Sequence, residues 1–457
     1  MTRVSRRVLA GAAILALVAV AVSAVRVAKP GPADAPLVIF TQIPVGDSAW
    51  SGAPGEAPWF PEHGRIVALD PHGKPGLRIL TADFHSARAP MVSPDGKRMV
   101  FSARRGAGDP WQIWEMQLQG GQTRLLTAEP GWYTDPAYLA DGRVVLSGRP
   151  GAATDAFALY TTTGTRLTRI TFHPEQDLAS QVLQDGQVLF VSRGQYLVTR
   201  DDGTGLRLFY QSADGSPPSG RAWETGDGSI LLVERGRLAG FSEKRPFHSR
   251  VELSGRVPGW FHSVSPLPSG KLVVSYRPPD GSRYRLYQFD PAEQRLDPLP
   301  GDDPAYHAVE PVVAAPRARP SAFYSVVDSS FKTGGLYCLD ANASSLSPAQ
   351  ARAPVARRLR VLGRDGLLGE VPLAADGSFY IELPGDLPVR FETVDDQGRL
   401  VRGPSAWLWV RPNEHRGCVG CHQTPELAPE NRVPEALIAE PVTLPAPKPR
   451  AAGGSPP

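Results

Sequence analysis

A turn followed by a hydrophobic strand recurs through the middle of this 457-residue chain. The turns are Asp95-Gly96, Asp141-Gly142, Asp185-Gly186, Asp227-Gly228 and Ser269-Gly270, and successive turns lie 46, 44, 42 and 42 residues apart. Such dipeptides suit tight hairpins because glycine adopts a positive φ without a steric penalty. A steady period of this length, with three or four strands in each unit, is typical of the blades of a β-propeller.

A less regular unit precedes the first clear repeat and brings the expected number of blades to six. It spans Leu37 to Thr81 and begins with the strand Leu37-Val38-Ile39-Phe40. We therefore predict a six-bladed propeller over residues 36–325, closed by pairing of the first and last blades, because an open sheet edge invites aggregation. A linear array of β-sandwiches is the alternative, and the single steady period disfavours it. The Ser93-Pro94-Asp95-Gly96 pattern resembles the WD40-like repeats of the TolB propeller group, which implies a fold but no particular function.

The composition excludes several other classes of protein. The chain holds 46 Gly and 47 Pro, and both residues interrupt helices, so a helical bundle is excluded. Only 3 Cys are present, too few for a small fold held by disulfides. The net charge of +3 gives no reason to expect a nucleic-acid partner.

The N-terminus has the pattern of an export signal. Arg3, Arg6 and Arg7 precede an uncharged run of 18 residues from Val8 to Val25. We interpret residues 1–30 as a signal peptide or an N-terminal membrane anchor, with a candidate cleavage site at Val22-Ser23-Ala24; a buried core helix is the less favoured alternative. This predicts a periplasmic or other extracytoplasmic protein, secreted or anchored. We expect membrane contact only through this segment, if it is retained.

A second β domain is expected after the propeller, because the period stops after Pro320. Seven runs are predicted to be strands: 323–327, 335–339, 358–362, 369–373, 379–383, 389–393 and 407–410. Several of these runs alternate polar and apolar residues, as half-buried strands do. We predict a small β-sandwich over 326–412, a haem-binding segment over 413–440 and a disordered Pro/Ala-rich tail over 441–457.

One short motif carries the chemistry. Cys418-Val419-Gly420-Cys421-His422 is a C-x-x-C-H sequence and holds two of the three cysteines. Its two thiols suit thioether bonds to the vinyl groups of one haem, and the adjacent His422 is placed to bind the iron as an axial ligand. A disulfide and a zinc site are the alternatives; zinc would need further ligands, and Cys338 is the only other cysteine. We therefore predict one covalently attached haem c.

The sixth ligand of that iron is not evident from the sequence. Met91 and Met99, like the other two methionines, lie far upstream and would have to reach the haem from the propeller. His307, at the joint between the two domains, and His415 are weak candidates for the ligand. An open distal site, with chemistry at the iron, remains the alternative.

The combination of these features resembles the hydrazine synthase alpha-subunit group. The resemblance rests on the propeller followed by Gly335–Asp340, Asp376–Phe379 and Arg416–His422, and it spans roughly residues 305–440. It implies that Cys418 and Cys421 attach a haem and that His422 is the motif histidine. The enzyme of that group joins nitric oxide and ammonium-level nitrogen into hydrazine within a multihaem complex. That enzyme has a tyrosine shortly after the motif, implicated at the iron, whereas Gln423-Thr424-Pro425-Glu426 contains none.

Three functional hypotheses follow. The first is an exported monohaem c-type cytochrome that transfers single electrons to or from a redox protein docked on the propeller. The second is a haem enzyme acting on a small nitrogen or oxygen species at an open iron site. The third is a non-redox binding propeller in which the haem is structural.

Overall fold

The computed structural model describes residues 37–48, 50, 59–70, 76–151, 156–212, 215, 218, 220–255, 257–343, 355–420 and 431–446. The described part of the chain is built almost entirely of strands, with one short 3-10 helix, η1 (Glu435–Ile438). No helix in this part is long and apolar enough to cross a membrane. The proposed export segment, residues 1–30, lies outside the described residues.

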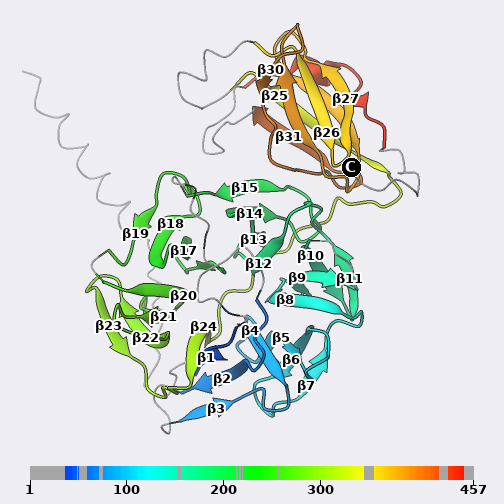
Figure 1. Ribbon diagram of the computed structural model, residues 1–457. Coiled ribbons are helices and arrows are strands. Elements are labelled where there is room, and N and C mark those ends of the chain that lie inside the picture. Colours follow the sequence, from blue (N-terminus) through cyan, green and yellow to red (C-terminus); the bar gives the residue numbers. More distant parts are fainter. Residues whose placement is uncertain are drawn as a thin grey trace, which may run out of the picture. The chain divides into compact units, whose positions relative to one another are not determined.

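Six four-stranded sheets follow one another around a common centre between residues 37 and 314 (Figure 1). This part of the fold is therefore propeller-like. In order along each sheet, the strands are β24 (Tyr306–Ala314), β1 (Leu37–Pro44), β2 (Arg65–Leu69) and β3 (Leu77–Ile79); β4 (Ser86–Val92), β5 (Arg98–Arg104), β6 (Gln112–Gln117) and β7 (Thr123–Leu125); β8 (Gly131–Tyr138), β9 (Val144–Pro150), β10 (Ala158–Thr163) and β11 (Arg166–Arg169); β12 (Asp177–Val182), β13 (Val188–Ser192), β14 (Gln195–Thr199) and β15 (Arg207–Tyr210); β16 (Trp223–Glu224), β17 (Ser229–Glu234), β18 (Arg237–Ser242) and β19 (Val251–Glu252); and β20 (Trp260–Pro266), β21 (Leu272–Arg277), β22 (Arg285–Asp290) and β23 (Arg295–Pro298).

The repeated turns lie where the sequence predicts them, between the first and second strands of their sheets. The glycine of each of the five turns has a positive φ, between 73° and 93°. The first and last strands of this region also pair, since β1 runs antiparallel to β24 from Leu37↔Ala314 to Pro44↔Tyr306. The first sheet thus contains both the first strand and the last strand of the propeller-like region.

Charged side chains link neighbouring sheets at the centre of the ring. The innermost strands β24, β4, β8 and β12 each carry a non-glycine residue with a left-handed φ of 50–56°, and each pairs with its neighbour through an irregular register. The Glu310 carboxylate of β24 accepts hydrogen bonds from Ala89 N on β4 (2.8 Å) and Thr41 Oγ1 on β1 (2.7 Å). The Arg88 guanidinium lies 2.5 Å from Glu310. In the same way, Asp135 accepts a hydrogen bond from Ala179 N of the next sheet (3.0 Å).

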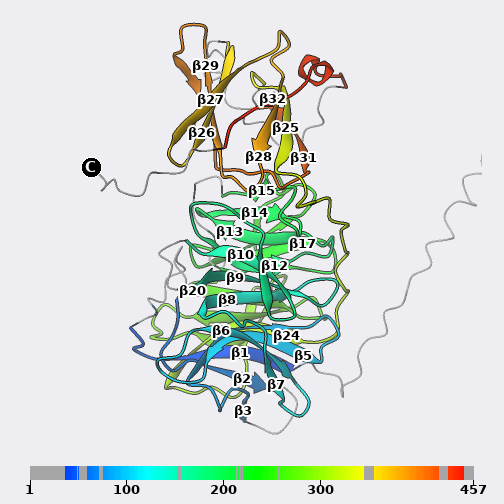
Figure 2. The ribbon, with the colours of Figure 1, turned by 90° about the vertical axis from the view of Figure 1, so that its right-hand side faces the viewer.

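The remaining two sheets form a small β-sandwich after residue 332, seen as two layers in Figure 2. Its core includes Leu336, Leu359, Ile381 and Val389, all shielded from solvent. One sheet has the order β31 (His415–Gly420), β25 (Thr333–Asp340), β28 (Phe379–Pro384) and β32 (Val442–Thr443); the other has the order β27 (Gly366–Pro372), β26 (Arg358–Gly363), β29 (Arg390–Val394) and β30 (Leu400–Arg402).

Three predictions about this region are wrong in detail. Residues 407–410 do not form a strand of the sandwich: Val410 is buried in the sandwich core, but Trp409 packs into the core of the propeller-like region, and only an isolated bridge joins Leu408 to Val389. Residues 323–327 form no strand either: Tyr324 is 96% exposed. The tail that was expected to be disordered begins with β32, which pairs with β28, and Leu444 is buried in the core. Residues 447–457 lie outside the described residues.

A connecting segment crosses the repeated turns of three successive sheets on its way to the sandwich. Arg317 N donates to Pro94 O (2.9 Å), Arg319 bonds to Ala140 O, and Ser321 N donates to Gln184 O (2.8 Å). A Cβ on Gly186 would lie 2.2 Å from Ser321 O, so this turn needs glycine for close approach as well as for its φ of 93°. These contacts hold residues 317–321 along the propeller-like region, directly before the run 323–327 that was predicted to be a strand.

The central carboxylate gives a stability prediction. Glu310→Ala removes the nearer of the two carboxylates that pair with the buried Arg88, leaving Asp135 at 3.6 Å, and deprives Ala89 N of its acceptor. The free energy of unfolding should therefore fall by about 3 kcal/mol in a urea titration. Glu293→Ala removes an ion pair whose two side chains are each more than half exposed and should cost less than about 1 kcal/mol. Equal effects of the two substitutions would contradict the structural role of Glu310.

Candidate functional site: a cavity beside Cys418

The first cysteine of the C-x-x-C-H motif lies in an edge strand of the sandwich. β31 pairs in parallel with β25, and this register sets Cys418 opposite Cys338 and Gly417 opposite Tyr337. A Cβ on Gly417 would lie 2.6 Å from the Tyr337 ring, so glycine permits the pairing. The Cys418 thiol is half-buried and forms no disulfide. The motif thus begins in a fixed strand instead of a loop.

The segment just before β31 is anchored to the third and fourth sheets of the propeller-like region. Trp409 is fully buried, and its Nε1 donates to Gly203 O (3.0 Å). The Glu414 carboxylate accepts hydrogen bonds from Gly205 N and Arg411 N, both at 2.8 Å. The Arg411 guanidinium donates to Arg169 O (3.1 Å). We call Trp409, Arg411 and Glu414 the dock.

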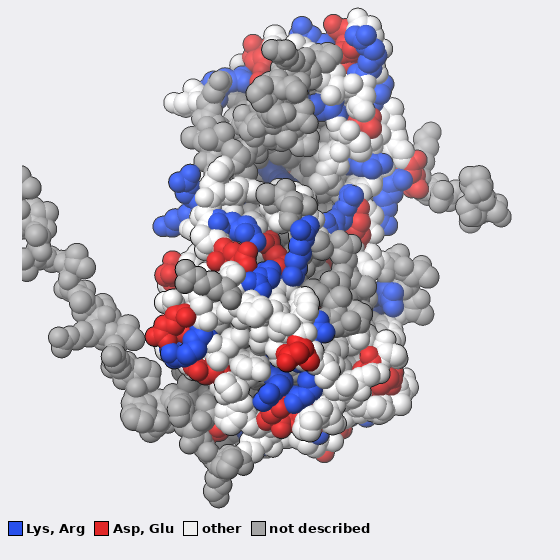
Figure 3. Space-filling view, turned by 60° about the vertical axis from the view of Figure 1, so that its left-hand side comes forward, with Lys and Arg blue, Asp and Glu red and all other residues white. Residues whose placement is uncertain are grey.

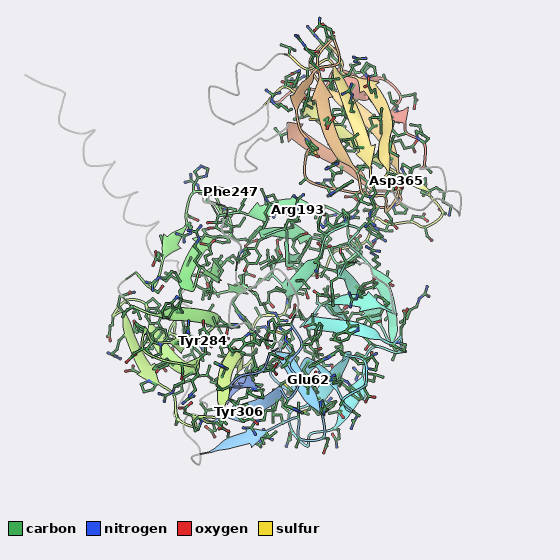
Figure 4. The ribbon with its side chains drawn as sticks, in the orientation of Figure 1. Glu62, Arg193, Phe247, Tyr284, Tyr306 and Asp365 are labelled. Atoms are coloured by element: carbon green, nitrogen blue, oxygen red, sulfur yellow. The ribbon has the colours of Figure 1, made fainter. Side chains whose placement is uncertain are left out.

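A cavity of about 460 Å³ lies beside Cys418, between the dock and the edge strands β30 and β31. One wall comes from the fourth sheet, where Figure 4 labels Arg193 at the turn between β13 and β14. The other wall comes from the inner face of the sandwich. The apolar lining is Leu197, Leu206, Leu208, Cys338, Phe379, Phe391, Trp407 and Leu408, and the charged lining is Glu175, Arg193, Arg207, Arg402 and Arg416.

The cavity fits a flat apolar cofactor that carries acidic groups. Its volume falls in the range of small-molecule pockets, and its four arginines face one glutamate. Among the described residues that line the cavity, Arg402 Nη1, Arg416 Nη1, Thr393 Oγ1 and Glu175 Oε2 are buried without a hydrogen-bond partner. Haem combines an apolar macrocycle with two carboxylates, and Cys418 supplies a thiol at the cavity wall. The residues present therefore suit the cofactor that the motif predicts.

A buried histidine joins this cavity to the dock. His173 is 4% exposed, its Nδ1 lies 2.8 Å from Asp177 Oδ1, and its ring packs edge-on against Trp409. Burial alone would lower the pKa of His173, but the Asp177 carboxylate outweighs it, so the pKa is raised. The sequence patterns do not indicate a role for His173. Its only local signal is the spacing of four residues to Asp177.

The structure does not bring the predicted sixth-ligand candidates into the cavity. Met91 and Met99 are buried in the core of the propeller-like region. His415 is exposed on β31 beside Tyr380, with the hydroxyl 3.3 Å from Nδ1. His307 lies on β24, where its Nδ1 accepts from Tyr284 N (3.2 Å) and its ring packs on Trp50. None of these residues lines the described cavity.

The other members of the motif, Cys421 and His422, fall outside the described residues, as do Gln423–Glu426. Within the described part of the chain, no three His, Cys, Asp or Glu side chains are grouped as metal ligands. On the face drawn in Figure 3, basic and acidic side chains are interspersed, without a large patch of one sign.

Comparisons with known proteins agree with the resemblance seen in the sequence. Residues 344–423 match the family described as hydrazine synthase alpha subunit middle domain. Hydrazine synthase subunit alpha of Kuenenia stuttgartiensis is 23% identical over 84% of this chain, and the chain spans 65% of that relative's length. A solved chain of the Kuenenia stuttgartiensis hydrazine synthase superimposes with a TM-score of 0.75 at 22% identity, covering 88% of this chain and 71% of that one. TolB from Acinetobacter baumannii gives a TM-score of 0.47 at 16% identity, covering 61% and 67% of the two chains.

The chain is thus similar to hydrazine synthase subunit alpha over most of its length, as the sequence motifs predicted. This likeness does not support the first hypothesis, a monohaem electron carrier. It agrees better with the second, an enzyme, because the relative is named as a subunit of hydrazine synthase.

The dock gives a testable prediction. Trp409→Ala removes a buried ring and the hydrogen bond to Gly203, so we expect the free energy of unfolding to fall by about 3–5 kcal/mol, with the sandwich unfolding at lower urea than the rest. Trp407→Ala is the matched control, because Trp407 is half-exposed and lines the cavity outside the dock. Unfolding of the Trp409 variant in one transition at the original midpoint would contradict the assignment.

Buried histidines give a prediction for pH. Burial among Trp50 and Tyr284 lowers the pKa of His262 from 6.5 to about 4. Between these two pH values, the unfolded chain binds a proton at His262 and the folded chain does not. The contribution of His262 to the free energy of unfolding is fully present above pH 6.5 and is lost as the pH falls toward about 4; the loss is on the order of 3 kcal/mol. His262→Phe should lose less stability than the parent between about pH 7 and pH 4 in urea titrations. Parallel pH profiles would show that His262 does not contribute.

Proposed function

We propose that this chain is a haem-bearing subunit of an oxidoreductase related to hydrazine synthase alpha, acting on a small nitrogen or oxygen species. The observation that carries the proposal is the cavity beside Cys418, which has apolar walls, an excess of arginine and a motif thiol at its edge. The similarity over 84% of the chain supports an enzyme rather than a simple carrier.

In this proposal, Cys418 and Cys421 would hold one haem c through their thiols, and His422 would bind its iron. When bound, the haem supplies an iron centre for one-electron chemistry and for binding small diatomic or nitrogenous molecules. The protein's own residues exclude water and hold the cofactor: Phe379 and Phe391 form an apolar wall, and Trp409 keeps that wall against the fourth sheet. Because no described Met or His side chain other than the Asp177-paired His173 lines the cavity, an open coordination position agrees with the residues there.

The six sheets and the N-terminal segment support two further parts of the proposal. We infer that the six sheets are the blades of a β-propeller and that this propeller is the platform for a protein partner, since the relative is named as a subunit. The basic and apolar N-terminal segment supports export to the periplasm, where c-type haem is attached.

Ligand binding by the reduced protein tests the proposal. The chain is expressed with a cytochrome c maturation system, and the reduced spectrum is recorded with and without carbon monoxide and nitric oxide. We expect covalent haem and a spectral shift with both gases. A low-spin spectrum that neither gas changes would contradict an enzyme with an open iron site and favour the electron carrier.

A double substitution tests the attachment site separately. Cys418→Ala with Cys421→Ala should abolish covalent haem, detected by haem staining after denaturing electrophoresis, while the protein remains exported and rich in β structure. Cys338→Ala is the matched control and should retain the stain. Haem that persists in the double variant would exclude the motif as the attachment site.

A further inference from the structure

Two arginines reach the cavity from opposite sheets of the sandwich. Arg416 lies on β31 and Arg402 on β30, and each strand is the edge of its own sheet. Both residues line the cavity that contains Cys418. Arg416 and Cys418 are two residues apart on one strand, so their side chains leave β31 on the same face. The guanidinium and the motif thiol therefore belong to the same wall.

One buried nitrogen of each guanidinium group lacks an acceptor in the described structure. Nη1 of each arginine is shielded from solvent and has no hydrogen-bond partner, and neither arginine forms an ion pair with a described residue. A buried donor of a charged group is costly when it is left unpaired. The arrangement is therefore complete only when an anionic ligand supplies the acceptors.

A third polar group points to the same ligand. Thr393 on β29 is 2% exposed, lines the cavity, and its Oγ1 has no partner among the described residues. Among the described residues of the lining, Glu175 is the only acidic side chain; its Oε1 lies 3.4 Å from Arg193, and its Oε2 has no hydrogen-bond partner. The cavity thus has an excess of positive charge and an unused hydroxyl donor beside mainly apolar walls.

We propose that Arg402 and Arg416 bind the two propionate carboxylates of the haem, and that the Thr393 hydroxyl donates to one of them. The inference rests on the proposed function, because it assumes that the haem occupies this cavity. A guanidinium group can donate two parallel N–H hydrogen bonds to the two oxygens of one carboxylate. This geometry suits a propionate better than the single ammonium of a lysine would. The mainly apolar walls disfavour a small hydrated anion as the natural ligand and favour a carboxylate attached to an apolar group.

The reduction potential of the haem reports this pairing without any measurement of activity. A cation next to a propionate makes the oxidised, more positive haem less favourable, so the pairing raises the potential. Removing the cation should lower it. We expect Arg402→Gln and Arg416→Gln each to shift the midpoint potential downward in a spectroelectrochemical titration, with a larger downward shift in the double variant.

Arg193→Gln is the matched control. It removes the same charge from the same cavity, but Arg193 is 60% exposed and is paired with Glu175. We expect a smaller shift in this variant. A second comparison uses Arg402→Lys, which keeps the charge but loses the forked geometry, and whose potential should lie between those of the parent and Arg402→Gln. Wild-type potentials in both Gln variants, or equal shifts in all three, would overturn the assignment.

The two proposals fail in distinguishable ways. If the parent chain attaches no haem, the proposed function is wrong. If the parent attaches haem and the arginine variants keep its potential, the proposed function survives and the propionate assignment is wrong. A small anion is tested with the haem-free Cys418→Ala, Cys421→Ala protein: stabilisation by acetate that Arg402→Gln abolishes would assign the arginines to a free carboxylate instead.

Discussion

The candidate site depends on the burial of Trp409 against Gly203. The Trp409 indole donates to Gly203 O, and Gly203 has a φ of 84° with a Cβ position only 2.2 Å from Ile170 O, so no other residue fits there without moving the backbone. Glu414 accepts a hydrogen bond from Gly205 of the same sheet, and Arg411 donates one to Arg169 O of β11 in the third sheet. Because β31 begins one residue after Glu414, these contacts determine where Cys418 lies.

The same contacts explain how two β modules form one cavity. Each sheet of the sandwich ends at an edge strand, β30 or β31, and neither edge is covered by another strand of the sandwich. The fourth sheet of the propeller-like region supplies the opposite wall of the cavity through Leu197, Leu206 and Leu208. Apolar surface that the sandwich could not bury alone thus becomes the lining of a site, and the edge strands bring Arg402 and Arg416 to it.

Local sequence patterns predicted the fold well, and non-local contacts account for what they missed. The Asp-Gly turns have a local cause in positive φ, so Gly96 and Gly186 lie in the hairpins that the sequence indicates. The Trp407–Val410 run has the composition of a strand, yet Trp409 is used to anchor a distant sheet. The pairing of Cys338 with Cys418 joins strands far apart in the sequence. Covalent haem at the C-x-x-C-H motif stays a prediction, and no pattern in the sequence links Arg402 to Arg416.

Hydrogen–deuterium exchange of the haem-loaded chain against the Cys418→Ala, Cys421→Ala variant tests the central claim, that the haem occupies the cavity between the fourth sheet and the sandwich. The account predicts added protection in two separate stretches, residues 191–211 and 402–420, with β1 to β7 unchanged. Protection confined to the residues next to the motif, with no change in the fourth sheet, would contradict it.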